Sequence, residues 1–366
     1  MGEGGKPVRQ AQGRPLVSIC MPTRNRGASL RDSVRNICAQ DYSNLDILIS
    51  DNASDDDTEA ACRELMGEDR RIRYVRHPVN IGLHGNHNFC IDQGRGEFLC
   101  IFHDHDRRVP GLVSEYVAFL QQHPNVGVVC ADWDLIDDRG ERIGIREYPV
   151  KAVTPGMDYI DETMRTGQAS IAIAGAMARR SALGSIRFVL DAPIGFGDFP
   201  IWFHLAETAD VGHISKILWS WRQNDVSLSA RPIEAVAREY AHNIGHYCDE
   251  HLARWPNHVD DVNRWRRYIR RYLFWALTYE VGLHFRDDRA RTGPQSSRSL
   301  FEIMNYRLTP EQFRSALAQM KTYRSGAVES LAYAVVSGLI GMGLTRPLAW
   351  ATRHHATARA LLRAIR

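Results

Sequence analysis

The sequence predicts an α/β fold with a doubly wound, mostly parallel sheet and a helical C-terminal extension. Over the first hundred residues, short apolar runs alternate with stretches of helical periodicity, as expected when a helix follows each strand. Polar and acidic residues come directly after these apolar runs, where parallel strands would end. From Ile233 onward the strand pattern stops and helical spacing takes over.

Strands and helices alternate in the prediction up to residue 103. The predicted strands cover 16–21, 45–50, 73–76 and 98–102, and the helices cover 29–40, a segment ending at Leu65 and a segment opening at 80–88. Leu30, Val34 and Ile37 show the spacing that supports the first helix. Right-handed crossovers would bring the loops after these strands to one edge of the sheet.

The alternation continues to about residue 230. We predict a strand at 126–131, a hairpin over 133–147, a helix starting at Asp198 and a strand at 215–221. Helices are then predicted at 235–251, 262–285, 309–320 and 327–366. The expected organisation is a disordered tail at 1–13, a main domain at 14–230 and a helical extension at 231–366.

Composition restricts the function classes. The chain has 366 residues, 44% of them hydrophobic, which is enough to bury a large core. A formal net charge of +3 does not indicate a dedicated nucleic-acid binder. The seven cysteines show no C-x-x-C spacing, which indicates reduced core thiols of a cytosolic protein.

Neither end of the chain carries a membrane-spanning signal. Residues 1–13 lack the apolar centre of a signal peptide. The longest uncharged run, 330–345, is shorter than a typical spanning helix and contains three glycines. We therefore expect a cytoplasmic protein, either free or peripheral on the inner face of the membrane.

The apolar run Phe98–Phe102 ends in four metal-capable side chains, His103-Asp104-His105-Asp106. Because a buried strand tolerates no unpaired charge, these side chains must lie at its exit, where ligands bind in open α/β sheets. Carboxylates suit Mg²⁺ or Mn²⁺, and imidazole shifts the preference toward Mn²⁺ or other transition ions. The alternative is an ordinary acidic surface loop.

Further motifs occur in a fixed order around this loop. They are Pro22-Thr23-Arg24-Asn25-Arg26, Asp51-Asn52-x-Ser54-x-Asp56, Asn80-x-Gly82 and Gly197-Asp198. Together with the strand-ending motif they resemble the inverting, nucleotide-sugar-dependent glycosyltransferases of the GT-A fold, of the family 2 type. The resemblance covers approximately residues 15–229. Each motif alone also fits an ordinary turn or helix cap.

The resemblance implies a nucleotide diphosphate sugar donor, most often a uridine one, and a divalent cation, Mn²⁺ or Mg²⁺, beside its diphosphate. The residues that it places at the donor are Pro22, Thr23, Arg24, Asn25, Arg26, Asp51, Asn52, Ser54, Asn80, Gly82, Asn86, Asp104 and Arg222. The acceptor would be a glycan, a lipid-linked molecule or a small molecule.

The acidic motif departs from the family pattern, which often reads Asp-x-Asp-Asp. Alignment places the usual metal-binding aspartate on His105, whereas a literal D-x-D selects Asp104 and Asp106. The expected metal ligands are therefore Asp104, His105 and Asp106, with Asp104 also placed near the ribose. Loss of metal dependence is the alternative.

A second departure concerns the catalytic base. Gly197 replaces the first acid of the family's acidic pair, while Asp198 and Trp202 remain. The resemblance makes Asp198 the general base that removes the acceptor's hydroxyl proton, with Trp202 at the acceptor, and implies a single displacement with inversion. The alternative role for Asp198 is capping the helix that it begins. Asn224 stands where family members often have a metal-assisting His.

The C-terminal third combines basic and aromatic residues, notably over 264–275 and again after 330. Two interpretations are open, an anionic membrane surface or packing against protein, including a second copy of the chain. Two rivals to the transferase are also open. One is a degenerate sugar-nucleotide-binding or scaffold protein. The other is a nucleotidyltransferase, although no Gly-rich, Lys-containing triphosphate loop follows the first strand.

Overall fold

The computed structural model describes residues 13–148, 150–167, 169–193, 197–222, 233–284, 318–324, 330, 332–334 and 336–337. The predicted tail, apart from Gly13, lies outside this part of the chain, as do Asn224 and most of the residues after 285. The predicted domain boundary at 230 also falls among residues that are not described.

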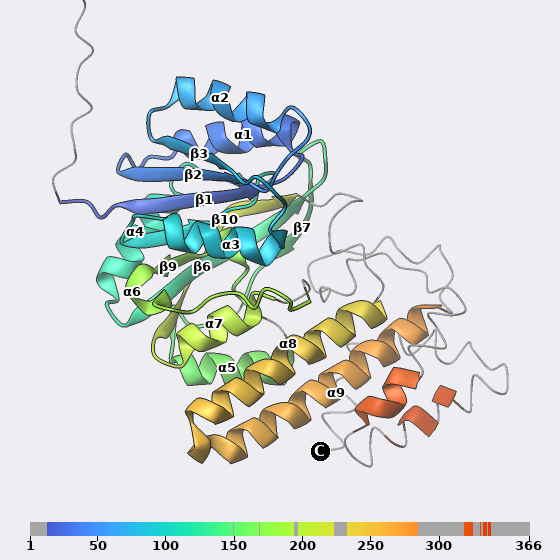
Figure 1. Ribbon diagram of the computed structural model, residues 1–366. Coiled ribbons are helices and arrows are strands. Elements are labelled where there is room, and N and C mark those ends of the chain that lie inside the picture. Colours follow the sequence, from blue (N-terminus) through green and yellow to red (C-terminus); the bar gives the residue numbers. More distant parts are fainter. Residues whose placement is uncertain are drawn as a thin grey trace, which may run out of the picture. The chain divides into compact units, whose positions relative to one another are not determined.

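The main domain is built from alternating strands and helices (Figure 1). Its strands are β1 (Val17–Thr23), β2 (Leu45–Asp51), β3 (Ile72–Arg76), β4 (Phe98–Ile101), β5 (Arg107–Arg108), β6 (Val126–Ile136), β7 (Arg142–Arg146), β8 (Val153–Thr154), β9 (Met177–Arg179) and β10 (Asp210–Arg222). Its helices are α1 (Gly27–Cys38), α2 (Thr58–Glu68), α3 (Gly82–Gln93), α4 (Leu112–Gln122), α5 (Gly156–Thr166), α6 (Arg180–Leu183) and α7 (Phe199–Ala206), with a 3-10 turn at Ile173–Gly175.

The described residues form one ten-stranded sheet with the path β3-β2-β1-β4-β9-β6-β10-β5. β3, β2, β1 and β4 are all parallel, as predicted. The other half contains the long parallel pair β6 and β10. In it β9 pairs antiparallel with both β4 and β6, and β7 pairs antiparallel with β6. The sheet is therefore mixed.

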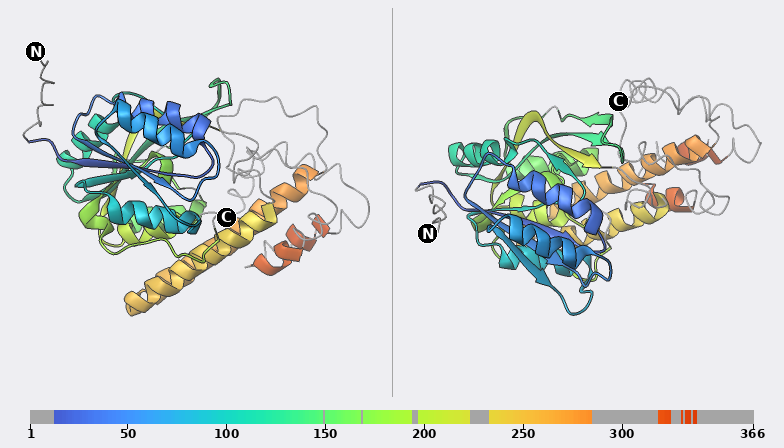
Figure 2. Two further views of the ribbon diagram at one scale, coloured as in Figure 1. Left: turned by 45° about the horizontal axis from the view of Figure 1, so that its top comes forward. Right: turned by 90° about the horizontal axis from the view of Figure 1, so that it is seen from above.

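The core of this domain lies against both faces of the sheet. Every residue of β2, β4 and β6 is buried, which matches the continuous apolar runs expected of strands covered on both sides. Helices α1 and α2 lie over one face of the parallel half and α3 over the other (Figures 1 and 2). The carboxyl ends of β1, β2 and β4 thus share one edge.

Three helices of this domain, α4, α5 and the four-residue α6, were not predicted. The sequence of α4 carries a clear helical signal, since Leu112, Val113, Tyr116, Val117 and Leu120 are all buried on one side. α5 contains three acidic residues and a shorter apolar stripe. The predicted hairpin is confirmed, but β6 continues without interruption from Val126 into its first strand.

The chain divides into two compact units. The first contains residues 1–160, 169–192 and 198–223, and the second contains 161–168, 193–197 and 224–366. Within the second unit, α8 (Ile233–Arg254) and α9 (Val259–His284) form a helical pair joined by a 3-10 turn at Pro256–His258. These confirm two of the predicted C-terminal helices. No helix among the described residues is long and apolar enough to cross a membrane.

Candidate functional site

Three loops that carry the predicted motifs meet at the carboxyl edge of the parallel half-sheet. β1 and β2 end in register, with Thr23 opposite Asp51. The backbone N–H of Phe102, just past β4, donates to the carbonyl of Cys20 in β1. This pairing brings the turn at 22–26, the loop at 51–56 and the motif at 103–106 to one place.

The turn after β1 is bonded to both of its neighbours. The Thr23 hydroxyl donates to Asp104 Oδ2 at 2.6 Å. Asn25 adopts a left-handed conformation with φ 55°, which Asn tolerates better than most residues. Its backbone N–H donates to the Ser54 hydroxyl at 2.9 Å, and its side-chain oxygen accepts from the backbone of Asp55. Arg24 is exposed beside it, while Pro22 and Arg26 are half-buried.

Asp51 is fully buried, and both of its carboxylate oxygens are occupied. Oδ1 accepts from the backbone and hydroxyl of Ser54, and Oδ2 accepts from the Tyr74 hydroxyl at 2.7 Å. Burial and this bond raise the pKa of Tyr74. In the described structure Asp51 therefore organises the loop, and its contact with a donor stays a prediction.

The start of α3 is fastened to the loop after β2. Asn52 accepts from the backbone N–H of Ile81 at 2.8 Å and donates to the carbonyl of Gly82 at 3.1 Å. Gly82 has φ +78°, a conformation that favours glycine, and its N–H donates to the Asn80 side chain. Asn80, Ile81 and Gly82 form an exposed turn that the buried Asn52 holds, and their contact with a donor stays a prediction.

The predicted contact between Asn86 and a donor is not supported by the surroundings of this residue. Its amide bonds the hydroxyl and the carbonyl of Ser50, and only 2% of the residue is exposed. Because both ends of the amide are used inside the domain, Asn86 fixes α3 to β2.

The acidic loop separates its two aspartates. Asp104 bonds Thr23 through Oδ2 and the His105 ring through Oδ1, at 3.0 Å. Asp106 has no exposed side-chain surface; its Oδ1 accepts from the backbone N–H of Arg222 at 3.0 Å, and its Oδ2 has no hydrogen-bond partner. His103 Nδ1 lies 3.7 Å from that free oxygen.

His103, His105 and Asp106 form a cluster that could hold a metal ion. One ligand atom from each lies within 4.8 Å of the others, a combination found nowhere else among the described residues. A divalent cation would satisfy the unpaired Asp106 Oδ2, so these residues fit the ion that the fold family implies. Asp104 is not part of the cluster, so its predicted place as a ligand is not supported. His103 was missing from the predicted ligands, although its spacing from His105 was a usable signal.

Burial and charge set the protonation of the loop. Burial lowers the pKa of His103 well below its ordinary value, with His105 adding to the effect. Burial also lowers the pKa of His105, but its bond to Asp104 and the charge of Asp106 outweigh this and raise it overall. Burial raises the pKa of Asp106. A neutral His103 has a lone pair available for a metal ion.

Arg108 supports the loop from beneath and was not predicted. Its side chain is fully buried, and Nη1 donates to the carbonyls of His103 and Asp106. Nη2 donates to the carbonyl of Ala174 and lies 3.8 Å from Asp106 Oδ2. The guanidinium also stacks over the Phe102 ring. Arg108 thus holds the loop's backbone and partly balances its buried charge.

Arg222 holds the same loop from β10. Its Nε donates to the carbonyl of His105, and its Nη1 donates to the carbonyls of Asp137 and Asp138. Most of its donors are therefore used on backbone, which does not support direct binding of a diphosphate by Arg222.

Asp198 occupies the N-cap position just before α7, yet its side chain makes no capping hydrogen bond to that helix. Instead Oδ2 accepts from the backbone N–H of Ile173 at 3.3 Å. Burial raises the pKa of Asp198, and Ile173 and Trp202 oppose that rise. The capping alternative is therefore not supported. Trp202 is 5% exposed, so it offers little surface to an acceptor, and its predicted acceptor contact is not supported.

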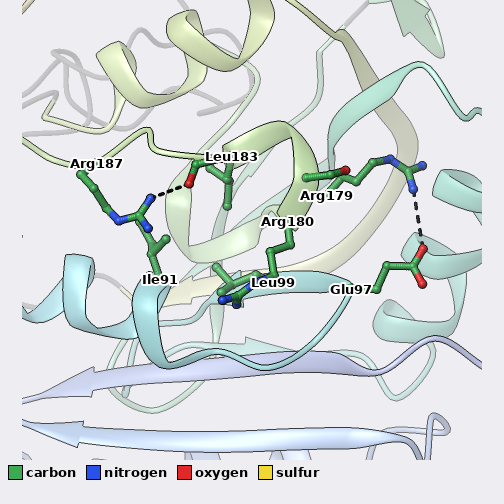
Figure 3. A pocket seen from close by; sticks show the side chains of 9 residues that line it. Ile91, Glu97, Leu99, Arg179, Arg180, Leu183 and Arg187 are labelled. Carbon is green, nitrogen blue, oxygen red and sulfur yellow. Dashed lines mark hydrogen bonds and ion pairs between the residues drawn. The ribbon is translucent and has the colours of Figure 1, made fainter.

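A cavity of about 530 Å³ lies elsewhere, at the amino end of β4 (Figure 3). Ile91, Leu99 and three arginines line it, but each arginine bonds backbone carbonyls inside the domain. This cavity is at the opposite end of β4 from the acidic loop and does not belong to the site.

A polar, metal-capable site at the carboxyl edge of parallel strands is typical of α/β proteins that bind a ligand at the ends of their strands. By its fold and its site, this domain is a protein of that class. Residues 18–186 match the model of glycosyl transferase family 2. These residues, a little under half of the chain, are similar to that family, and the domain has the GT-A fold.

Curated relatives agree with this assignment. A GalNAc(5)-diNAcBac-PP-undecaprenol beta-1,3-glucosyltransferase from Campylobacter jejuni is 35% identical over 114 residues, 31% of this chain and 36% of that protein. The putative colanic acid biosynthesis glycosyl transferase WcaA from Escherichia coli is 32% identical over 108 residues, 30% of this chain and 39% of that protein. The chain spans about a quarter to two fifths of the first relatives it matches.

Solved structures share the fold. S. aureus TarS 1-349 has a TM-score of 0.57 and 14% identity, covering 93% of this chain and 92% of that one. The mannosyltransferase PcManGT from Pyrobaculum calidifontis, in complex with GDP-Man and Mn²⁺, has a TM-score of 0.53 and 17% identity, covering 94% and 85%.

Proposed function

We propose that this chain is a metal-assisted glycosyltransferase that transfers a sugar from a nucleotide diphosphate sugar, with UDP favoured, to an acceptor hydroxyl with inversion. The observation that carries the proposal is the 2.6 Å bond between Thr23 and Asp104. It joins the turn that the family uses for the nucleotide to the loop that carries the metal cluster, so both parts of the donor would meet one preassembled edge.

His103, His105 and Asp106 would hold the divalent cation, which supplies positive charge to the leaving diphosphate. Arg108 and Arg222 keep these ligands in place through the loop's carbonyls. Asp198 would accept the proton of the attacking hydroxyl. Its raised pKa makes it a stronger base than an exposed carboxylate.

A lipid-linked or glycan acceptor is part of the proposal, because one relative is named for an undecaprenol-linked substrate. A UDP donor is supported by the solved complex of TarS 1-349 with UDP-GlcNAc, and Mn²⁺ by the PcManGT complex that contains this ion. A place on the inner face of the membrane would suit such an acceptor.

Calorimetry with UDP and GDP, each with and without Mn²⁺, tests the donor site. We expect UDP to bind more tightly with Mn²⁺, and His105→Ala to lose about tenfold or more of the metal-dependent gain because a ligand is removed. The control is His246→Ala, whose exposed imidazole lies 3.5 Å from Glu250. If neither UDP nor GDP binds, with or without Mn²⁺, the proposed donor site is wrong.

The rival function is a degenerate sugar-nucleotide-binding protein, favoured by His105 at a position where the family often has Asp. It predicts nucleotide binding without turnover. Release of sugar from donors in the presence of Mn²⁺, measured across a panel of nucleotide sugars, would exclude this rival. The family match disfavours the nucleotidyltransferase.

A further inference from the structure

Exposed aliphatic side chains gather at one place on the first unit. Among the described residues, ten large hydrophobic side chains are exposed, and five of these fall on two short segments. They are Val79, Ile81, Leu83, Val189 and Leu190, between 37% and 64% exposed. We call these five residues the aliphatic patch. Single exposed apolar residues are ordinary, whereas a group of them marks an interaction surface.

The two segments are held together by partly buried polar contacts. The Asn88 amide donates to the carbonyl of Phe188 and accepts from its N–H, both at 2.8 Å. The Phe188 ring stacks on His87 and His84, with centroids 5.0 and 5.4 Å apart. His84 Nδ1 lies 2.9 Å from the carbonyl of Val189. The segment after α6 thus runs along α3 (Figure 1) and keeps Val189 and Leu190 outward.

The patch adjoins the proposed donor edge. Ile81 and Gly82 bond Asn52, the residue next to Asp51, so the first half of the patch is the outer side of the turn that closes the loop after β2. Under the proposed function, the acceptor would reach the sugar at this edge. A partner that covered the patch permanently would stand in its way, whereas the acceptor itself would not.

We propose that the aliphatic patch binds the hydrocarbon part of a lipid-linked acceptor. The segments 78–85 and 188–190 contain no Asp, Glu, Lys or Arg, which disfavours a charged polymer. The patch has only Val, Ile and Leu, without the aromatic and Arg anchors of protein interfaces. Five side chains on two short segments are also fewer than the roughly 20–30 residues a side of a stable protein interface. A single hydrocarbon chain can bind to a surface of this few side chains.

This inference rests on the proposed function, and its test separates the two. The probe is dodecyl phosphate below its micelle concentration, titrated by calorimetry into the full chain, with inorganic phosphate as the head group alone. Neutral phosphatidylcholine vesicles form a second arm, which reports hydrocarbon offered by a bilayer. We expect dodecyl phosphate to bind in the presence of saturating UDP and inorganic phosphate not to bind.

Val189→Ser with Leu190→Ser should weaken dodecyl phosphate binding about tenfold, since two exposed aliphatic contacts are lost. Val79→Ser should weaken it less. Met66→Ser is the matched control, because Met66 on α2 is as exposed as Val189 and lies outside the patch. UDP binding should be the same in all of these variants, so that a failure of UDP binding would count against the proposed function alone.

The inference is overturned if dodecyl phosphate does not bind, if UDP displaces it, or if Met66→Ser weakens it as much as the patch variants do. A change of sedimentation coefficient on Val189→Ser with Leu190→Ser would also overturn it, because the patch would then be a contact between two copies of the chain. Vesicle binding lost only in the patch variants would support it.

Discussion

Asp106 carries the buried negative charge of the site, and the groups around it must balance that charge. Its carboxylate has no exposed surface, one oxygen accepts a backbone N–H, and the other lies between an imidazole and a guanidinium without a hydrogen bond. A buried unpaired oxygen is costly unless another charge satisfies it. Arg108 provides part of that charge, and a bound cation would provide the rest.

Replacing Arg108 tests how strongly the loop depends on it. Arg108→Met leaves Asp106 buried without a nearby fixed cation, so we expect a loss of about 3–5 kcal/mol in the free energy of unfolding. Urea denaturation measures this loss. Adding Asp106→Asn to Arg108→Met removes the unbalanced carboxylate and should recover part of the lost free energy. Arg63→Met removes an exposed ion pair to Glu59 and should cost less than about 1 kcal/mol. Equal losses in the two arginine variants would contradict this role.

As the proposed base, Asp198 would link activity and stability in opposite directions. Burial raises its pKa, so the folded state disfavours the ionised form, and stability falls as the pH rises from the ordinary carboxyl pKa toward the raised one. A base must be ionised, so kcat should fall as the pH drops through the raised pKa. Asp198→Asn should lower kcat about 10²–10⁴-fold without lowering the melting temperature.

The exposed carboxyl of Asp191 provides the control for this prediction. Asp191→Asn should leave both kcat and its pH profile unchanged. A variant Asp198→Asn that keeps most of its turnover would show that another group takes the proton.

At the scale of elements, the long parallel pair β6 and β10 supports the acidic loop from the other half of the sheet. Trp133 and Trp219 stack across this pair with centroids 5.0 Å apart. Deeper in the pair, Cys130 Sγ lies 3.4 Å from His213 Nδ1, and His213 Nε2 lies 3.0 Å from Asp132. Burial raises the pKa of Cys130 to about 12, so its thiol is not a nucleophile and the chain of contacts is structural.

Gly175 allows Trp219, one of the two stacked tryptophans, to pack closely against the backbone. A Cβ at Gly175 would stand 2.1 Å from Cε2 of Trp219, so Gly175→Ala should cost about 1–3 kcal/mol and weaken the near-ultraviolet circular dichroism of the tryptophan pair. Gly67 on α2 has no atom within 4 Å of the same position. Gly67→Ala should instead stabilise by about 0.5–1 kcal/mol. Destabilisation by both changes in equal measure would reject the packing argument.

At the scale of the molecule, the two compact units are interleaved in sequence, since residues 161–168 belong with the C-terminal helices. Within the second unit, Asp161 Oδ1 accepts from Trp265 Nε1 at 3.1 Å and from Arg264 Nε at 2.9 Å. A segment from the middle of the chain thus completes the helical pair's polar contacts.

Asp161→Ala should therefore destabilise the second unit. It leaves the indole N–H of the buried Trp265 without its acceptor, which costs about 1–3 kcal/mol. Hydrogen exchange over 262–269 should speed up accordingly. The neighbouring Glu162→Ala removes only an exposed pair with Arg165 and should change exchange little. Unchanged exchange in Asp161→Ala would contradict the assignment.

The sequence predicted the parallel half of the sheet because its strands are apolar throughout and end in polar motifs. It did not predict β9, a three-residue strand whose antiparallel pairing leaves no periodic signal. Among the predicted residues, His105 and Asp106 lie together, and Asp198 is half-buried at the start of α7. Asn86 and Arg222 were assigned by position alone, and only their hydrogen bonds show that both serve the scaffold.

The proposed site residues come from two separate stretches of the sequence, one before and one after the antiparallel strand β9. All the residues that would hold the nucleotide and the metal fall before residue 107, on the β3-β2-β1-β4 side, whereas Asp198 and two of the five residues of the aliphatic patch come after β9. Recombination between relatives at the α4 region would therefore exchange Asp198 and the β6–β10 half of the sheet while keeping the proposed nucleotide and metal residues together. Under the proposed function, chimeras joined there would test which half of the domain sets the acceptor preference while the sugar donor stays the same.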